Sequence, residues 1–236
     1  MLGDSLTHGA ASANYVDALA DKLDEREPDT YELVNAGVNG QLAYNAVLRL
    51  DEVIECDPDF VFVLIGTNDA NATLIPETQI RLMKEQSLPQ VPDAEWYREN
   101  LGIIARRLVS ETEAHVVFLS LPPIGEDPSH PAYRLSKEYG LIVKAVAGDY
   151  GVSYLPLFET MEAYLENNPG NPKHDHAKTR SLMMIGLLKH YIFRSTWNRI
   201  GEENGFTLHT DYLHLNDIGS DMVAGLAAGF ILKNSQ

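Results

Sequence analysis

Residues 60–69 read FVFVLIGTND, six apolar residues followed directly by four small or polar ones. A short apolar run that stops at a glycine is typical of a strand buried on both faces. Three further runs of this kind predict strands at residues 31–38, 115–121 and 152–157. The stretch therefore predicts a parallel sheet covered by helices on both sides.

The segments between these strands have the period of helices. Apolar residues recur three and four apart in residues 14–25, 43–55, 96–113 and 133–150, which are expected to be the crossover helices. A last helix is predicted from Asn216, as its cap, to Lys233. Its expected buried stripe comprises Ile218, Met222, Val223, Leu226 and Phe230. The alternation predicts an α/β fold, and 236 residues with 44% apolar content fit one domain over residues 1–236.

Two segments are longer than the connections that this fold needs. Residues 71–95 are rich in proline and polar residues and are expected to form a loop, with one helical turn at most. Residues 158–210 form a second insertion, predicted to be helical, which separates the last strand from the final helix. Within it, residues 181–197 are apolar around most of a helix, so this segment is expected to be covered. The cover is the protein core or a second subunit in a homo-oligomer, and the alternative is a lid that faces the substrate.

Charge and composition exclude several classes of partner and cofactor. Lys and Arg number 18 against 34 Asp and Glu, and 18 − 34 = −16, so nucleic acid and anionic membrane surfaces are repelled. No apolar run approaches the roughly 20 residues of a transmembrane helix. Cys56 is the single cysteine, and His174 and His176 lie in a polar stretch, so we expect no disulfide, metal or cofactor.

The start of the chain bears on its location in the cell. Only Met1 and Leu2 precede a polar motif at a point where a buried strand is expected. The sequence as written predicts a soluble cytoplasmic protein, and a secreted one if the native amino terminus is longer and has been trimmed.

Four polar clusters follow or flank the predicted elements. They read GDSLT at residues 3–7, NAGVNG at 35–40, GTND at 66–69 and DYLH at 211–214. Two of them follow predicted strands directly, and the last precedes the final helix. Open parallel sheets bind ligands beyond the carboxyl ends of their strands, so the clusters are expected to meet at one site.

The residue types in these clusters fit acyl transfer. The hydroxyl of Ser5 is a weak nucleophile unless a base takes its proton, and His214 is the candidate base. Asp211, three residues earlier, is expected to accept a hydrogen bond from the imidazole and so to set its tautomer. An Asp and a His at this spacing also occur in exposed loops, and His209 lacks an Asp three residues before it.

In this order the four clusters resemble the SGNH, or GDSL, hydrolase superfamily. Ser5 matches the family's nucleophile, Gly40 the second glycine of its second block, and Asn68 the asparagine of its third. Asp211 and His214 match its Asp-x-x-His pair. The resemblance implies a three-layer α/β/α sandwich with a flavodoxin-like parallel sheet and no cofactor. Members include esterases, lipases, thioesterases and carbohydrate deacetylases.

An oxyanion hole completes the expected site. Its donors are the backbone N–H groups of Ser5 and Gly40 and the side-chain amide of Asn68. Gly40 and Asn68 also suit simple turns, and Asp4 and Asp69 are expected to hydrogen-bond loop amides. The predicted function is hydrolysis of small carboxylic esters through an acyl-enzyme on Ser5. The alternatives are acyl transfer to a sugar or lipid hydroxyl, or a non-catalytic binding protein of the same fold.

Overall fold

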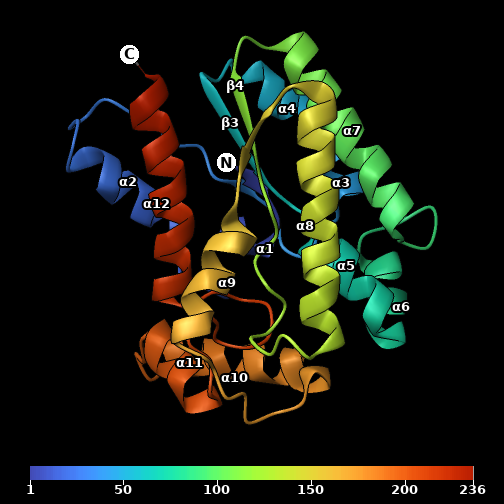
Figure 1. Ribbon diagram of the computed structural model, residues 1–236, viewed down its shortest axis with the longest axis vertical. Coiled ribbons are helices and arrows are strands. Elements are labelled where there is room, and N and C mark those ends of the chain that lie inside the picture. Colours follow the sequence, from blue (N-terminus) through green and yellow to red (C-terminus); the bar gives the residue numbers. More distant parts are fainter. Residues whose placement is uncertain (236) are drawn as a thin grey trace.

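A computed structural model describes residues 1–235 and has a five-stranded parallel sheet at its centre (Figure 1). The strands are β1 (Leu2–Gly3), β2 (Ala36–Gly37), β3 (Phe60–Leu64), β4 (His115–Leu119) and β5 (Ser153–Leu155). Their order is β2-β1-β3-β4-β5, the arrangement of flavodoxin-like folds. Leu2 pairs with Val63, and Val63 pairs in turn with Phe118. The strand that ends just before Ser5 is therefore inside the sheet.

Helices cover both faces of the sheet, which confirms the predicted α/β/α sandwich (Figure 1). One face carries α2 (Tyr15–Asp24), α9 (Leu157–Asn167) and α12 (Asp217–Asn234). The other carries α3 (Ala43–Val47), α4 (Leu50–Glu55), α5 (Thr67–Leu74), α7 (Ala94–Glu111) and α8 (Pro131–Tyr150). Alternate residues of β3 serve the two cores, since Phe62 faces α12 and Val63 faces α7.

The cap of the last helix is confirmed, but its buried stripe is only partly right. Asn216 caps α12 by accepting a hydrogen bond from the Gly219 amide at 3.0 Å. Val223 is fully buried as predicted, whereas the other four members of the stripe are only partly buried. The most deeply buried positions are mainly small residues, Ser220, Ala224, Ala227 and Ala228, with Ile231. Small side chains let α12 pack closely against α2, and that proximity is not visible in the apolar period alone.

The helix predicted at residues 43–55 is broken at Leu48 and Arg49. The chain forms α3 and α4 as separate helices, and the side chain of Arg49 makes tertiary contacts at the break. Arg49 donates to the backbone carbonyl of Gly3 at 3.0 Å and to the Gln41 side chain at 2.7 Å. The guanidinium thus satisfies a carbonyl at the end of β1.

The prediction of a loop at residues 71–95 is wrong. The chain forms α5 up to Leu74 and then α6 (Pro76–Glu85). Pro76 is at the start of α6, where its fixed φ and missing N–H favour a helix rather than break one. Leu82 on α6 is buried with Leu42 and Trp96, which anchors the helix.

The predicted strands exist, and the first of them is much shorter than expected. Within residues 31–38 only Ala36–Gly37 form a strand, because the neighbouring β1 has only two residues with which to pair. The Met1 amino group donates to the Val34 carbonyl at 2.8 Å, which extends this contact backwards. A two-residue strand still suffices to hold the segment before Ser5 in the sheet.

The insertion at residues 158–210 is helical, as predicted. It holds most of α9, a 3₁₀ turn at His176–Lys178, α10 (Thr179–Tyr191) and α11 (Trp197–Asn204). The last two helices lie across one end of the three layers (Figure 1). Within residues 1–235, no helix is both long and apolar enough to cross a membrane.

The apolar segment at residues 181–197 is divided between α10 and α11 and is not fully covered. Leu182 and Trp197 are buried, but five apolar side chains of α10 and the following turn are at least half exposed. These are Met184, Ile185, Leu188, Ile192 and Phe193, which we call the α10 patch. The predicted contact with a second subunit stays a prediction.

Candidate active site

The candidate nucleophile stands at a sharp turn from strand to helix. Ser5 is the first residue of α1 (Ser5–His8), directly after β1, and is half-buried. Asp4 caps this helix by accepting from the Leu6 amide at 3.0 Å. At Gly3 a β-carbon would overlap the Thr7 side chain, so the turn can be this tight only with glycine. The turn places Ser5 at the carboxyl end of a central strand.

The candidate base and its carboxylate lie together in one buried loop. His214 Nδ1 is 2.9 Å from Asp211 Oδ2, and the other oxygen of Asp211 accepts from the backbone amides of Leu213 and His214. Asp211 is fully buried and His214 almost so. The backbone bonds fix the carboxylate, which in turn orients the ring. Within residues 1–235, Nε2 of His214 makes no hydrogen bond, so this nitrogen is free for a reacting proton.

The charges of this pair support one another. Burial opposes ionisation of Asp211, yet the neighbouring His214 ring and the backbone amides hold the pKa of its carboxyl below the usual value. Burial also disfavours a charged His214, but Asp211, with help from Asp4, raises the pKa of the ring above 6.5. An imidazolium at this position is therefore stabilised.

Several contacts bring the beginning of the chain to the segment that carries His214. The Ala13 amide donates to the Leu215 carbonyl at 3.1 Å, and the Ser220 hydroxyl donates to the Ala13 carbonyl at 2.7 Å. The charge of His214 also acts on the pKa of Asp4, the residue before Ser5. No hydrogen bond joins the Ser5 hydroxyl to His214 in residues 1–235. Such bonds are often long in free enzymes and shorten when substrate binds.

The two other candidate oxyanion donors are connected through Gln41, the residue after Gly40. Gly40 follows β2 with a φ of +74°, and Asn68 is in the first turn of α5. The Asn68 amide donates to the carbonyl of Gln41 at 3.1 Å and lies 3.4 Å from the Asp4 carboxylate. The third polar cluster therefore contacts the residue that follows the second, and Asn68 connects the third cluster to Asp4 in the first.

Asp4 and Asp69 each accept a hydrogen bond from a backbone amide as predicted, but these amides are in the first turns of α1 and α3 and not in loops. Asp69 accepts from the Ala43 amide at 3.1 Å, while Asp4 accepts from Leu6. Burial raises the pKa of Asp4 to about 6 and that of Asp69 to about 7, although these amide bonds favour the ionised forms.

The remaining histidines occupy other environments. Burial lowers the pKa of His176 to about 4, and its ring packs against Tyr212 with centroids 5.0 Å apart. No cluster of three potential metal-ligating side chains occurs in the part of the chain that the structure describes.

His209 lacks a nearby Asp in sequence but contacts Glu126. Its ring nitrogen Nδ1 lies 2.9 Å from Glu126, and Nε2 lies 2.9 Å from the Pro123 carbonyl. With both nitrogens engaged, His209 is not available as a base.

Sequence reasoning missed three residues that support the site. They are Gln41 and Arg49, which link the second cluster to β1, and Glu126. Glu126 follows β4 as the polar clusters follow their strands, so its place beyond a strand end was the available signal.

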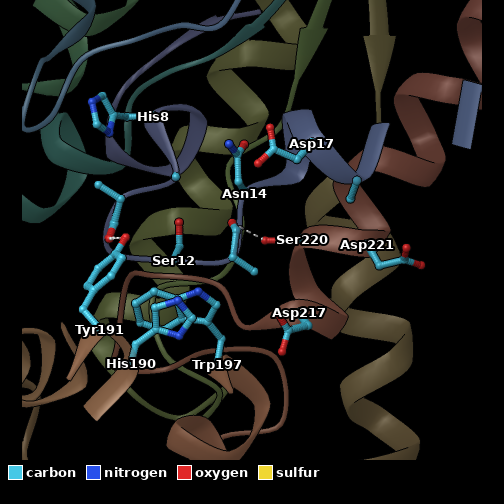
Figure 2. A pocket seen from close by; sticks show the side chains of 14 residues that line it. His8, Ser12, Asn14, Asp17, His190, Tyr191, Trp197, Asp217, Ser220 and Asp221 are labelled. Carbon is cyan, nitrogen blue, oxygen red and sulfur yellow. Dashed lines mark hydrogen bonds between the residues drawn. The ribbon is translucent and has the colours of Figure 1, made fainter. Parts of the chain in front are cut away.

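A cavity of about 690 Å³ lies between the end of α1 and the helices α2, α10, α11 and α12 (Figure 2). Its lining includes His8 at the end of α1 but not Ser5, Asp211 or His214. Figure 2 shows His190 and Trp197 together on one side of the cavity, and their rings stack with centroids 4.0 Å apart. Three carboxylates, Asp17, Asp217 and Asp221, also line the cavity, which disfavours anionic ligands.

Comparison with known proteins gives the family. The model of the GDSL-like lipase/acylhydrolase family matches residues 1–222. The chain belongs to this GDSL-like family. As a GDSL-like lipase/acylhydrolase, it is a carboxylic-ester hydrolase. A comparison with curated protein sequences gave no match.

Solved structures similar to this GDSL-like hydrolase show the same fold. The acetyl xylan esterase AlAXEase is 23% identical with a TM-score of 0.70, over 98% of this chain and 97% of that one. Axe2, an acetylxylan esterase from Geobacillus stearothermophilus, is 19% identical with a TM-score of 0.65, over 98% and 91%. LAE5, a hydrolase from the metagenome of Lake Arreo, Spain, is 20% identical with a TM-score of 0.67, over 98% and 94%.

Proposed function

We propose that this protein is a serine hydrolase that cleaves esters through a covalent acyl-enzyme on Ser5. The observation that carries the proposal is the bond of 2.9 Å between His214 Nδ1 and Asp211 Oδ2, which leaves Nε2 without a partner in residues 1–235. A ring held in this tautomer accepts a proton at Nε2. Ser5 follows Asp4, whose carboxylate interacts with the same ring.

The reaction proceeds in two steps. The Ser5 oxygen bonds to the acyl carbon while His214 takes the hydroxyl proton, and the resulting imidazolium returns it to the leaving alcohol as the ester bond breaks. Water then attacks the acyl-enzyme, gives a proton to His214 and releases the acid, and the proton returns to Ser5. The raised pKa of His214 favours the imidazolium that both steps require.

The negative oxygen formed in each step needs donors. Ser5 N–H, Gly40 N–H and the Asn68 side chain supply them on this proposal. Asn68 has one N–H on the Gln41 carbonyl, and its contact with Asp4 is long at 3.4 Å. The second N–H of Asn68 is therefore only weakly engaged and can donate to an oxyanion while the first stays on Gln41.

For the substrate we propose acetyl esters of neutral carbohydrates. The support is the likeness to two acetyl xylan esterases over nearly the whole chain, together with a polar cavity at the end of α1. Carboxylates such as Asp17 accept hydrogen bonds from sugar hydroxyls, and they disfavour acidic leaving groups.

The test combines active-site labelling with a substrate series. A fluorophosphonate probe is expected to label the wild type and not Ser5→Ala, while Ser110→Ala, which replaces an exposed serine of α7 that does not line the cavity, is the serine control. Acetylated xylo-oligosaccharides are expected to be cleaved faster than longer-chain p-nitrophenyl esters. Labelling and turnover that persist in Ser5→Ala would reject the acyl-enzyme. Faster release of acyl product onto an added alcohol than onto water would show a transferase, and no turnover at all would indicate a binding protein.

A further inference from the structure

A second carboxylate–imidazole pair, Glu126 and His209, lies beneath the loop that carries Asp211 and His214. Both side chains are fully buried, and Glu126 Oε1 is 2.9 Å from His209 Nδ1. A β-carbon at Gly170 would overlap the Glu126 carboxylate, so the chain covers this pair closely. The pair belongs to no motif that the sequence contains.

The partners of the His209 ring determine its protonation. Nε2 is 2.9 Å from the Pro123 carbonyl, which can only accept a hydrogen bond. Nδ1 faces a carboxylate, which when ionised also only accepts. Two acceptors require two N–H groups, and a ring with both is an imidazolium.

Glu126 is in surroundings that favour its ionised form. Its oxygens accept from the backbone amides of Thr207 at 2.7 Å, Leu208 at 2.6 Å and His209 at 3.1 Å. Burial opposes the charge, but His209 and these amides hold the pKa of Glu126 below its usual value. A carboxylate with three amide donors and a ring N–H is fully satisfied.

The pair holds the two ends of the turn that carries Asp211 and His214. Residues 209–215 form a closed turn, since His209 bridges Leu215 and the Thr210 amide donates to the His214 carbonyl at 2.8 Å. The segment that carries Glu126 touches the turn a second time, where the Gly125 amide donates to the Tyr212 carbonyl at 2.8 Å. The turn, with Asp211 and His214 in it, is thus fastened to the segment after β4.

We propose that Glu126 and His209 form a charged pair that positions Asp211 and His214 for catalysis. Glu126 and His209 are positioning residues, because neither reaches the reacting atoms, and the inference rests on the proposed role of His214 as the base. A displaced turn changes the direction of Nε2 towards Ser5 without changing the cavity beside α1, whose lining does not include the turn.

The first test is nitrogen NMR of the wild-type protein labelled in histidine. At about pH 7, both ring nitrogens of His209 are expected to carry protons, with the signal identified by its loss in His209→Gln. A single protonated nitrogen on His209 would overturn the proposal. This result does not depend on activity, so it stays separate from the Ser5→Ala test of the proposed function.

The second test is Glu126→Gln in the full-length protein. The two oxygens of Glu126 accept separately, one from the Thr207 backbone N–H and the other from the His209 ring. The Gln side chain has only one oxygen, so its NH₂ group would face one of these two donors. We expect kcat for p-nitrophenyl acetate to fall about 10- to 100-fold, with KM changed less than about twofold, because misplacement affects the transition state. The proton signal of the Asp211–His214 bond is expected to shift in the same variant.

Glu162→Gln is the matched control. Glu162 is on α9, in another part of the fold, and accepts a hydrogen bond from Lys137 at 2.9 Å. This variant should leave kcat and the Asp211–His214 signal unchanged. If Glu126→Gln fails to fold, Glu126→Asp keeps the charge but withdraws it from the amides and is expected to lower kcat in the same way. Unchanged kcat in a folded Glu126 variant would reject the positioning role.

Discussion

The side-chain amide of Asn68 donates to the backbone carbonyl of Gln41 at 3.1 Å, which fixes Asn68 beside the turn that contains Gly40. Two groups proposed to stabilise the same oxyanion are therefore held to each other before any substrate is present. Donors held in advance cost no reorganisation during the reaction.

Asn68→Ala is expected to lower kcat by about a hundredfold to a thousandfold, with little change in KM, because a donor to the oxyanion is lost. Steady-state kinetics with a small acetyl ester measure both constants. Asn71→Ala is the control on the same helix, since the side-chain oxygen Oδ1 of Asn71 is buried and has no hydrogen-bond partner within residues 1–235. Equal losses in the two variants would show that Asn68 acts only through folding.

Activity is expected to fall with acidity through a midpoint above 6.5, because His214 must be neutral to take the Ser5 proton and Asp211 raises the pKa of the ring. A profile of kcat/KM against pH measures this midpoint. A profile that stays flat to about pH 5 would contradict the role of His214 as base.

Asp211→Asn is expected to lower kcat by about 10⁴-fold, since an amide N–H would face Nδ1 and stabilise the wrong tautomer. The Asn oxygen can still accept from the amides of Leu213 and His214, so the variant is expected to fold. Circular dichroism checks the fold beside the kinetics. A folded Asp211→Asn protein with near-normal kcat would reject the proposed triad.

Asp69 makes stability depend on pH in a direction that can be tested. Its pKa is about 7 in the folded protein and ordinarily 3.8, so the folded state binds more protons between these values. Stability therefore decreases as the pH rises through this window. Asp69→Asn removes the charge and keeps an acceptor for the Ala43 amide.

As the pH rises from about 4.5 to about 8, the Tm of Asp69→Asn is expected to increase relative to the Tm of the wild type. Thermal unfolding followed by circular dichroism measures it, with Asp24→Asn as an exposed control on α2. Parallel curves for Asp69→Asn and the wild type would contradict the raised pKa.

The α10 patch is expected to mediate self-association. Replacing Ile185 and Leu188 by Ser should shift sedimentation towards the monomer, because both side chains are about half exposed and apolar. Leu141→Ser on α8 removes an equally exposed apolar side chain outside the patch and should leave sedimentation unchanged. A wild type that is monomeric at all concentrations would reject the subunit contact.

The sequence predicts the elements of this fold well where the signal is local. The apolar run before Gly66 becomes β3, and Asn216 caps α12, because burial on both faces and capping act over a few residues. Four polar clusters at strand ends likewise indicate one site, since parallel strands place their carboxyl ends at the same edge.

The errors arise where distant contacts decide. Arg49 contacts the Gly3 carbonyl at a break in a segment whose apolar period is continuous. The segment that proline content alone suggested was a loop forms α6, which Leu82 anchors against Leu42 and Trp96. The partner of His209 is Glu126, far away in sequence, so no spacing rule could have paired them.

The contact between Ala13 and Leu215 has a consequence for how the protein is synthesised. Ser5 leaves the ribosome well before His214, so the growing chain holds a nucleophile without its base until residues 211–214 have been synthesised. On the proposed mechanism, premature termination at any earlier codon yields an inert product, and hydrolysis begins only when the last helix has closed against the first turns.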